Sequence, residues 1–179
     1  MSRQPYLEAV NERVIVFDGA FGTFVQDLDL GPADFGGESL EGCNEMLCLT
    51  RPDVIESMHR AFLDAGVDAI ETASFGSFST VLAEYNIPEQ AYELNVAAAS
   101  IARRVADSYE SDGRPRYVAG SIGPGTKLPS LGHIDFVTLR ESYEEQARGL
   151  IDGGADLFLI ETCMDLLQIK AAMQACRRA

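Results

Sequence analysis

The hydrophobic residues of this chain are concentrated in four short runs, separated by longer segments of mixed polarity. Each run consists of aliphatic, aromatic or small residues and is bounded by turn residues, which is the pattern of a short β-strand. The runs are continuously apolar rather than alternating, so we expect strands buried on both faces, as in a parallel sheet. The predicted strands are residues 14–17, 69–72, 117–120 and 157–160.

Helical patterns fill the segments between the strands. Thr50, followed by Arg-Pro-Asp, is typical of a capped helix start, and Thr138 with Glu141 forms a capping box for a helix that ends near Gly153. An alanine-rich stretch without Gly or Pro predicts a helix over residues 89–109. The remaining segments are a helix from Leu166 to the C-terminus and loops at 27–41 and 111–116.

One phrase occurs twice in the chain. Residues 64–72 read Asp-Ala-Gly-Val-Asp-Ala-Ile-Glu-Thr, and residues 152–162 read Asp-Gly-Gly-Ala-Asp-Leu-Phe-Leu-Ile-Glu-Thr. Each copy predicts a helix end, a turn with Gly, and a short strand that ends in Glu-Thr. Repeated alternation of helix and buried strand predicts βα units, because parallel neighbours need a crossover connection.

The predicted fold class is therefore α/β, with four βα units forming the first half of a (β/α)8 TIM barrel. A complete barrel takes roughly 250 residues, whereas this chain has 179, so we expect one domain over 1–179 and no second domain. Right-handed crossovers predict the strand order 1-2-3-4 with the helices on one face. Open edges at the two outer strands would favour self-association. The side chains expected to lack cover are those of Val16, Ile70, Val118 and Leu159.

The composition restricts the class of partner. The chain has 28 acidic and 14 basic residues and a net charge of −14, so we expect no binding to nucleic acid or anionic membranes and easier binding of a small zwitterionic or cationic ligand. No apolar run reaches the roughly 20 residues of a membrane span, and the start does not resemble a signal peptide, so the expected location is cytoplasmic. The four cysteines show no CxxC spacing and are expected to be reduced thiols.

Three acids are predicted to meet where the strands end. Asp18 follows the first predicted strand, Glu71 lies in the second and Glu161 follows the fourth, and the carboxyl ends of parallel strands share one edge. Like charges held close together are unfavourable unless a cation lies among them. An ammonium group would supply that cation. Alternatively, one acid caps a helix or pairs with Arg or Lys, and Glu71 is the one we most expect to be structural.

Glycine-rich segments flank these acids. Gly19 and Gly22 allow a tight turn after Asp18 that could expose N–H groups to a carboxylate or phosphate, although this segment taken alone favours a plain strand-to-loop turn. Residues 120–127 lack the order of a phosphate-binding loop, and no strand leads into a dinucleotide-binding motif. His59 and His133 have no partner in the sequence that suggests a metal site.

Five ordered motifs resemble the homocysteine S-methyltransferase family. The loop over residues 123–133 is most similar to the N-terminal, homocysteine-binding module of cobalamin-dependent methionine synthases. The motifs are Asp-Gly-Ala-Phe-Gly-Thr from Asp18, Gly-Cys-Asn-Glu from Gly42 with Thr-Arg-Pro-Asp from Thr50, Ala-Gly-Val-Asp-Ala-Ile-Glu-Thr-Ala-Ser-Phe-Gly from Ala65, Gly-Ser-Ile-Gly-Pro from Gly120 and Glu-Thr at Glu161.

The resemblance implies a barrel whose open end binds homocysteine and presents its sulfur to a methyl donor. Asp18 and Glu161 match the acids that hold the α-ammonium, and Gly19 and Ala20 match the backbone N–H groups that take the carboxylate. Thr72 and Ser121 are implied as lesser contacts. No residue of this chain is assigned a catalytic role.

The resemblance also implies Zn²⁺ bound by three cysteines in motifs that this chain lacks, so the ligands are expected beyond residue 179 and this chain alone is expected to be inactive. A substitute site of Cys43, Cys48 and Cys163 is the weaker possibility. Methylcobalamin, supplied with cobalamin and folate modules of a longer protein, is the implied donor; betaine and S-methylmethionine are alternatives. The rival interpretations are an aldolase-like barrel, for which Lys127 is the available lysine, and a non-catalytic amino-acid-binding fragment.

Overall fold

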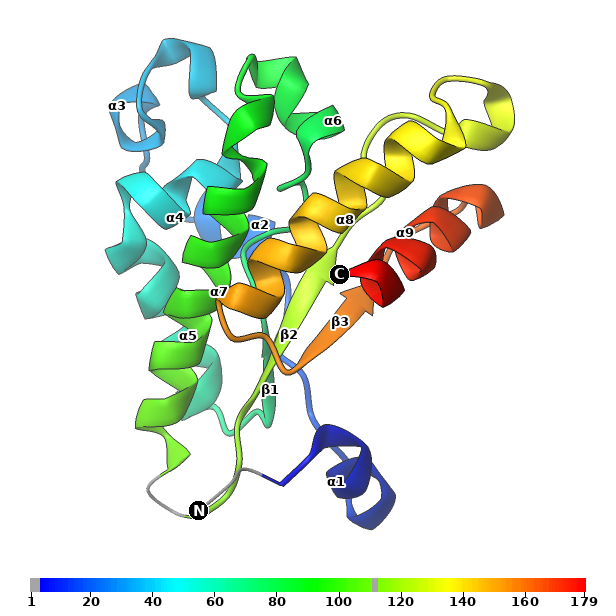
Figure 1. Cartoon of the computed structure of the whole chain (residues 1–179). Helices are drawn as coiled ribbons and strands as arrows, with labels where there is room; N and C mark the ends of the chain where they lie inside the picture. The colour runs from blue at the N-terminus through cyan, green and yellow to red at the C-terminus, as the bar shows by residue number, and fades with distance from the viewer. Residues whose placement is uncertain (1–3, 111–112) are drawn as a thin grey trace.

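The computed structural model describes residues 4–110 and 113–179, so part of the loop expected at 111–116 lies outside it. A parallel sheet with the order β1-β2-β3 forms the centre of the molecule (Figure 1). Its strands are β1 (Ala69–Glu71), β2 (Tyr117–Ile122) and β3 (Leu157–Ile160). Three of the four predicted strands are therefore confirmed, with every pairing among them parallel.

Helices occupy most of the remaining described chain, and none of them is long and apolar enough to span a membrane. The α-helices are α1 (Tyr6–Glu12), α2 (Phe21–Gln26), α3 (Pro32–Phe35), α4 (Leu47–Thr50), α5 (Pro52–Asp64), α6 (Ser79–Leu82), α7 (Ala91–Ser108), α8 (Phe136–Asp152) and α9 (Leu166–Arg178). Short 3₁₀ turns are η1 (Glu38–Leu40), η2 (Asn44–Met46), η3 (Ala83–Tyr85), η4 (Pro88–Gln90) and η6 (Pro129–Leu131). The region 27–41, predicted as a plain loop, thus contains α3 and η1.

The first predicted strand, 14–17, is not a regular strand. Phe17 forms one isolated parallel bridge with Ala69, on the side of β1 away from β2. Carboxylates replace part of the missing ladder. Asp68 Oδ2 accepts the N–H of Val16 at 2.9 Å, and both Asp18 oxygens accept the N–H of Glu71 at 3.0 Å. The segment therefore holds the predicted place in the order, with side chains making bonds that backbone carbonyls make in a ladder.

Burial differs between the strands. All six residues of β2 are buried, whereas β3 is only half-buried and Val14 and Val16 are 82% and 50% exposed. The expectation of burial on both faces is therefore wrong for 14–17 and β3. Ile70 and Val118, predicted to lack cover, are fully buried because Leu63, Ala102 and Val105 of the helical layer pack against them.

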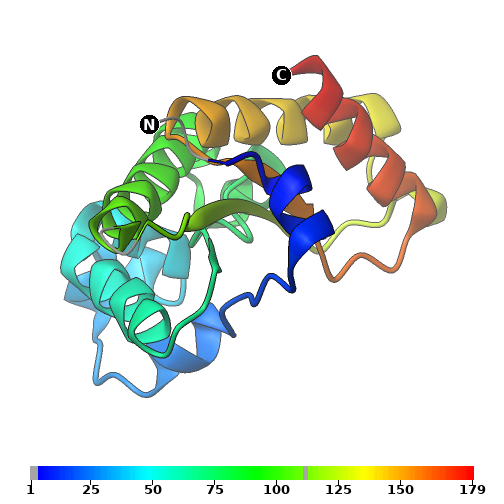
Figure 2. The same ribbon diagram turned by 90° about the horizontal axis from the view of Figure 1, so that it is seen from below.

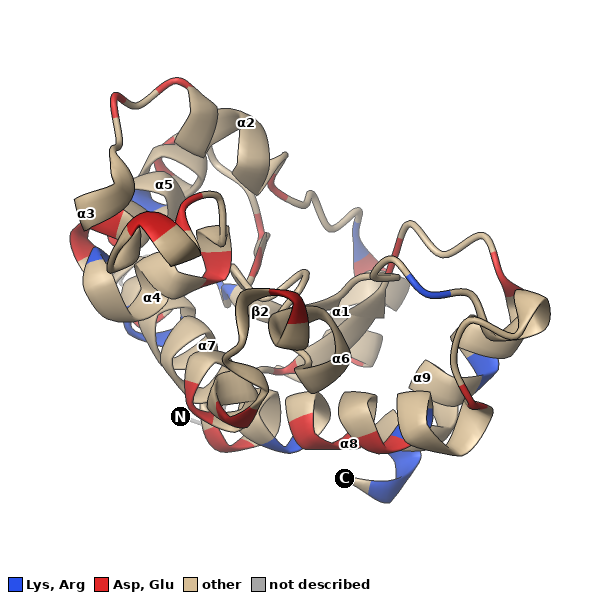
Figure 3. Ribbon diagram, turned by 90° about the horizontal axis from the view of Figure 1, so that it is seen from above, with Lys and Arg blue, Asp and Glu red and all other residues tan. Residues whose placement is uncertain are grey.

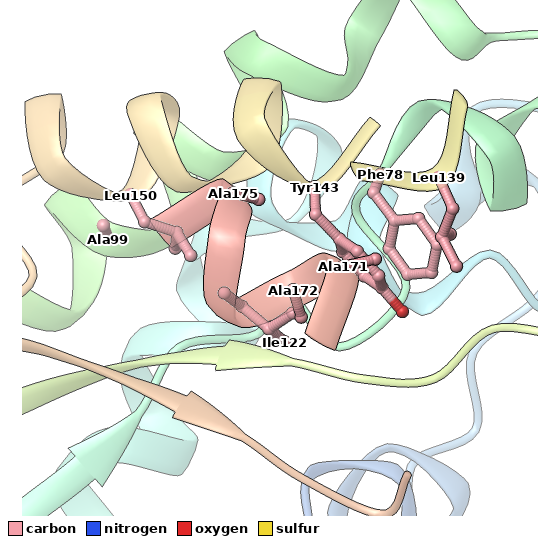
Figure 4. Packing of buried hydrophobic residues seen from close by; sticks show 9 residues of the cluster. All are labelled: Phe78, Ala99, Ile122, Leu139, Tyr143, Leu150, Ala171, Ala172 and Ala175. Atoms are coloured by element: carbon pink, nitrogen blue, oxygen red, sulfur yellow. The ribbon is translucent and has the colours of Figure 1, made fainter. Parts of the chain in front are cut away.

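The long helices cover one face of the sheet, as predicted (Figure 2). On the other face, Ala9 of α1 packs against Ala69 of β1 and Tyr117 of β2. Between α8, α9 and β2, the largest cluster joins Tyr143, Leu150 and Ile122 to three alanines of α9 (Figure 4). Small alanine side chains allow α9 to approach this layer closely.

Two predicted helix caps are wrong. Helix α5 begins after Arg51, and the Thr50 hydroxyl instead donates back to the Met46 carbonyl at 2.9 Å. Helix α8 begins at Phe136 because the Asp135 carboxylate accepts the N–H groups of Val137 and Thr138. A carboxylate at the helix start satisfies two free N–H groups and leaves Thr138 inside the first turn.

The repeated phrase has a structural explanation. Gly66 and Gly154 both have φ near +97°, a left-handed conformation that favours glycine. Two residues further on, the Asp68 and Asp156 N–H groups donate to the carbonyls of Val16 and Val118, each at 2.8 Å. Their carboxylates accept the N–H groups of the same two valines, at 2.9 and 2.8 Å. Each copy therefore joins the start of one strand segment to its neighbour.

Candidate functional site

The three predicted acids lie at the same edge of the sheet, as the parallel topology requires. Glu71 is the last residue of β1, Glu161 directly follows β3, and Asp18 follows the bridge residue Phe17. Figure 3 views the molecule from the side towards which the strands point. This edge is the usual place of a binding site in parallel α/β sheets. We call these three side chains the acid cluster.

Asp18 is held by the neighbouring strand. Its backbone N–H donates to the Ala69 carbonyl at 3.0 Å, and its two carboxyl oxygens accept the Glu71 N–H. Burial, with the nearby charges of Glu71 and Glu161, raises the pKa of Asp18 to about 8, against the lowering effect of that N–H. Asp18 is therefore mostly protonated at neutral pH in the free protein.

The ionisation of Glu71 depends on Glu161. Burial, the charge of Glu161 and a hydrogen bond between the two carboxyls raise the pKa of Glu71 to about 7. Ser121 Oγ donates to Glu161 Oε1 at 2.5 Å. In the described chain, no Lys, Arg or His forms an ion pair with any member of the acid cluster. The alternative that one acid pairs with Arg or Lys is thus not found there, and the cluster can accept a cationic group.

Gly19 and Ala20 lie next to Asp18 and are exposed. Ala20 precedes α2, and neither residue donates its backbone N–H to an acceptor in the described part of the chain. An added Cβ at Gly19 would lie 3.3 Å from the Phe62 ring. Two N–H groups beside the acid cluster are therefore available to a ligand, such as a carboxylate.

Thr72 and Ser121 are hydrogen-bonded to each other but differ in their contact with the acid cluster. Both are buried, but only Ser121 contacts an acid of the cluster. The Thr72 hydroxyl contacts Ser74 Oγ at 2.6 Å and accepts the Ser121 N–H at 3.0 Å, so it lies behind the cluster. Ser74 and Gln146 also belong to this arrangement and were not identified from the sequence. Ser74 stands in a quoted motif, whereas no sequence signal marks Gln146 within its helix.

Backbone strain follows Glu161 directly. Thr162 has φ near +58°, in the left-handed region that a β-branched residue rarely adopts. Cys163 Sγ donates to the Glu161 carbonyl at 3.2 Å, just after this turn. Such conformations are concentrated at functional sites, where the surrounding structure maintains them.

The Gly-rich loop after β2 is fixed from the helical layer. Tyr143 of α8 donates its hydroxyl to the Gly123 carbonyl at 2.9 Å, and Gln168 of α9 donates to the Pro124 carbonyl. Lys127 Nζ reaches the Thr80 carbonyl at 3.5 Å. The Lys127 side chain is therefore directed towards helix α6. An aldolase-like barrel would need a lysine at a strand end, so this contact weakens that alternative.

Cys163 lies beside Glu161, whereas Cys43, Cys48 and His59 are buried in the helical layer. Cys43 and Cys48 are buried, and their burial raises the pKa of both thiols. His59 is fully buried, burial lowers its pKa to about 4, and neither ring nitrogen has a partner in the described residues. Across residues 4–110 and 113–179, no group of three or more His, Cys, Asp or Glu side chains could hold a metal ion.

Comparisons with known proteins agree with this arrangement. The family model described as homocysteine S-methyltransferase matches residues 15–179. Methionine synthase of Mycobacterium tuberculosis is 52% identical over 173 residues, and that of Mycobacterium leprae is 51% identical over 173 residues. Each alignment covers 97% of this chain but 14% of the relative, so the chain spans about one-seventh of these relatives.

Solved structures show the same fold at lower identity. The metallated form of the homocysteine methyltransferase MmuM from Escherichia coli superposes with a TM-score of 0.77 at 24% identity, covering 98% of this chain and 64% of that one. Its oxidized form gives a TM-score of 0.76 at 22% identity, covering 97% and 63%. The shared arrangement of sheet and helices thus extends over nearly all of this chain.

Proposed function

The chain belongs to the homocysteine S-methyltransferase family, and from this premise we propose that it forms the amino-acid-binding part of a homocysteine methyltransferase. The acid cluster is the observation that carries the proposal. Asp18 and Glu161 would hold the α-ammonium of homocysteine, with Glu71 beside them. A ligand ammonium would supply the positive charge that the described chain does not bring to these carboxyls.

The same ligand has a carboxylate that needs donors. Gly19 and Ala20 are exposed residues next to Asp18, and their N–H groups have no acceptor among the described residues, which supports this role. Ser121 contacts Glu161 and is proposed to support its position, while Thr72 acts from behind it. Both charged ends of an amino acid would therefore be bound by residues of this chain, which directs the side-chain sulfur away from the acids.

The proposed reaction is methylation of the homocysteine thiol to give methionine. The thiol loses its proton, its sulfur forms a bond to the methyl carbon, and the bond from that carbon to the donor breaks with the electron pair leaving on the donor. A free thiol has a pKa near 8.5 and is mostly protonated at neutral pH, so activation is needed. The family resemblance implies Zn²⁺ for that purpose. The described residues do not fit a zinc site, so we assign the metal to ligands outside this chain.

The architecture and partners follow from the same proposal. We propose that 14–17, β1, β2 and β3 with their helices are the first four units of a (β/α)8 barrel. The likeness to methionine synthases supports methylcobalamin, or 5-methyltetrahydrofolate through it, as the donor bound by other modules. Self-association through exposed Val14, Val16 and β3 stays a prediction that sedimentation at low and high salt would test.

Calorimetric titration of the 179-residue chain tests the proposed binding. We expect l-homocysteine to bind measurably. 4-Mercaptobutanoate, which lacks the ammonium group, should bind at least about tenfold more weakly, and 3-aminopropanethiol, which lacks the carboxylate, should lose affinity by a similar factor. A charge-assisted hydrogen bond contributes ~1.5–3 kcal/mol, which corresponds to at least that ratio. Equal affinity for l-homocysteine and its analogue without an ammonium group would contradict the role of the acid cluster.

A further inference from the structure

Behind the acid cluster, three buried residues form a closed ring of hydrogen bonds. Thr72 and Ser74 follow β1, and Ser121 lies in β2; they are 3%, 0% and 2% exposed. Ser74 Oγ donates to the Ser121 carbonyl at 2.8 Å, Ser121 N–H donates to Thr72 Oγ1 at 3.0 Å, and the two hydroxyl oxygens lie 2.6 Å apart. The ring therefore connects the two strand ends that carry Glu71 and Ser121.

The number of protons fixes the direction of each bond. A hydroxyl has one hydrogen to donate, and that of Ser74 is used on the Ser121 carbonyl. The short contact between the hydroxyls must then be a donation from Thr72 to Ser74. The hydroxyl protons of Thr72 and Ser74 are both used inside the ring, and the backbone of Ser121 is held at both its N–H and its carbonyl. The Ser121 hydroxyl remains free to donate to Glu161 Oε1.

Gln146 connects the ring to helix α8. Its side chain is fully buried, and Nε2 donates to the Ser74 carbonyl at 2.7 Å and to the Ser121 carbonyl at 3.4 Å. The opposite orientation of the amide would place its oxygen against two carbonyl oxygens, so the acceptors fix its orientation. These two bonds satisfy the nitrogen of the buried amide, whereas its oxygen has no partner among the described residues.

We propose that Ser74 and Gln146 are positioning residues for the ammonium-binding carboxyl of Glu161. They act through Ser121, whose hydroxyl holds one oxygen of Glu161 and limits rotation of that carboxyl. This inference rests on the proposed function, because it concerns the same site. Neither residue touches the ligand, so each influences binding through the orientation of Glu161.

Ser74→Ala, with Ser77→Ala as the matched control, tests the inference in the 179-residue chain. Ser77 is also fully buried on the same loop, but its hydroxyl has no partner among the described residues. We expect Ser74→Ala to weaken l-homocysteine binding about 3- to 10-fold, the loss of one ordinary hydrogen bond, and Ser77→Ala to leave it unchanged. In a Glu161→Gln background the effect of Ser74→Ala should fall below about 2-fold, because coupled residues are not additive. An equal loss in both backgrounds would mean that Ser74 is merely structural and would overturn the proposal.

A second measurement does not depend on ligand. The ¹³Cδ resonance of Glu161 should move in Ser74→Ala and in Gln146→Met and stay in place in Ser77→Ala. If it stays in place in both of the first two variants, the positioning role is contradicted even when the variants fold normally. A wild-type chain that does not bind l-homocysteine would instead refute the proposed function and leave this resonance as the test of the ring.

Discussion

Glu161→Gln should weaken l-homocysteine binding about 10- to 100-fold, the largest effect that we expect from one substitution at this site. The change removes the charge from the carboxyl that Ser121 holds in place, while keeping its size. Its loss would leave the ligand ammonium with the carboxyls of Asp18 and Glu71 alone, so one charge-assisted hydrogen bond would be lost.

The matched control is Glu89→Gln, which makes the same chemical change at an exposed position on η4. Calorimetry with the two variants separates the loss of a local contact from the change in total charge. A similar affinity for wild type and Glu161→Gln, with the control also unchanged, would remove Glu161 from the ammonium site.

Binding of l-homocysteine should strengthen about 10- to 100-fold between pH 6 and pH 8. In the free protein the pKa of Asp18 is raised to about 8 and that of Glu71 to about 7, in both cases chiefly by burial, so both carboxyls hold protons at pH 6. An ammonium ligand favours the ionised carboxyls, so at low pH Asp18 and Glu71 must release protons when the ligand binds. At high pH both carboxyls are already ionised and no proton is released. The affinity is therefore lost as the pH falls through 8 and 7.

Asp18→Asn is the variant that checks this explanation. Asparagine retains a carbonyl oxygen that can accept the Glu71 N–H but cannot titrate, so the slope of affinity against pH should decrease, mostly near pH 8. Titrations in two buffers of different ionisation enthalpy would count the released protons directly. A pH profile that is flat in the wild type, or unchanged in Asp18→Asn, would show that Asp18 does not titrate with binding.

The sequence predicts the edge where the site lies, because strand ends in a parallel sheet meet there whatever the details of each strand. Asp18, Glu71 and Glu161 could be placed together for that reason alone. The irregular pairing of residues 14–17 could not be predicted, because the hydrophobic pattern does not show that the carboxylates of Asp18 and Asp68 accept backbone N–H groups in place of carbonyls. The same limit applies to the start of α8, where the Asp135 carboxylate competes with the Thr138 capping box.

The support behind the acids was beyond sequence reasoning. Gln146 and Ser74 are 72 residues apart, and their contact depends on how α8 packs on the loop after β1. A glutamine within an amphipathic helix gives no signal of a buried position. Glu71 was the acid most expected to be structural, whereas in the structure the charge of Glu161 helps to raise the pKa of Glu71.

The central claim is that the acid cluster binds the ammonium group of homocysteine, with Asp18 and Glu161 holding it and Glu71 beside them. The most direct measurement is carboxyl ¹³C NMR of the chain during titration with l-homocysteine at pH 7. We predict that the resonances of these three residues move together with one binding constant, while those of Asp135 and Glu89 do not change. Saturable binding that leaves all three of the predicted resonances in place would contradict the account.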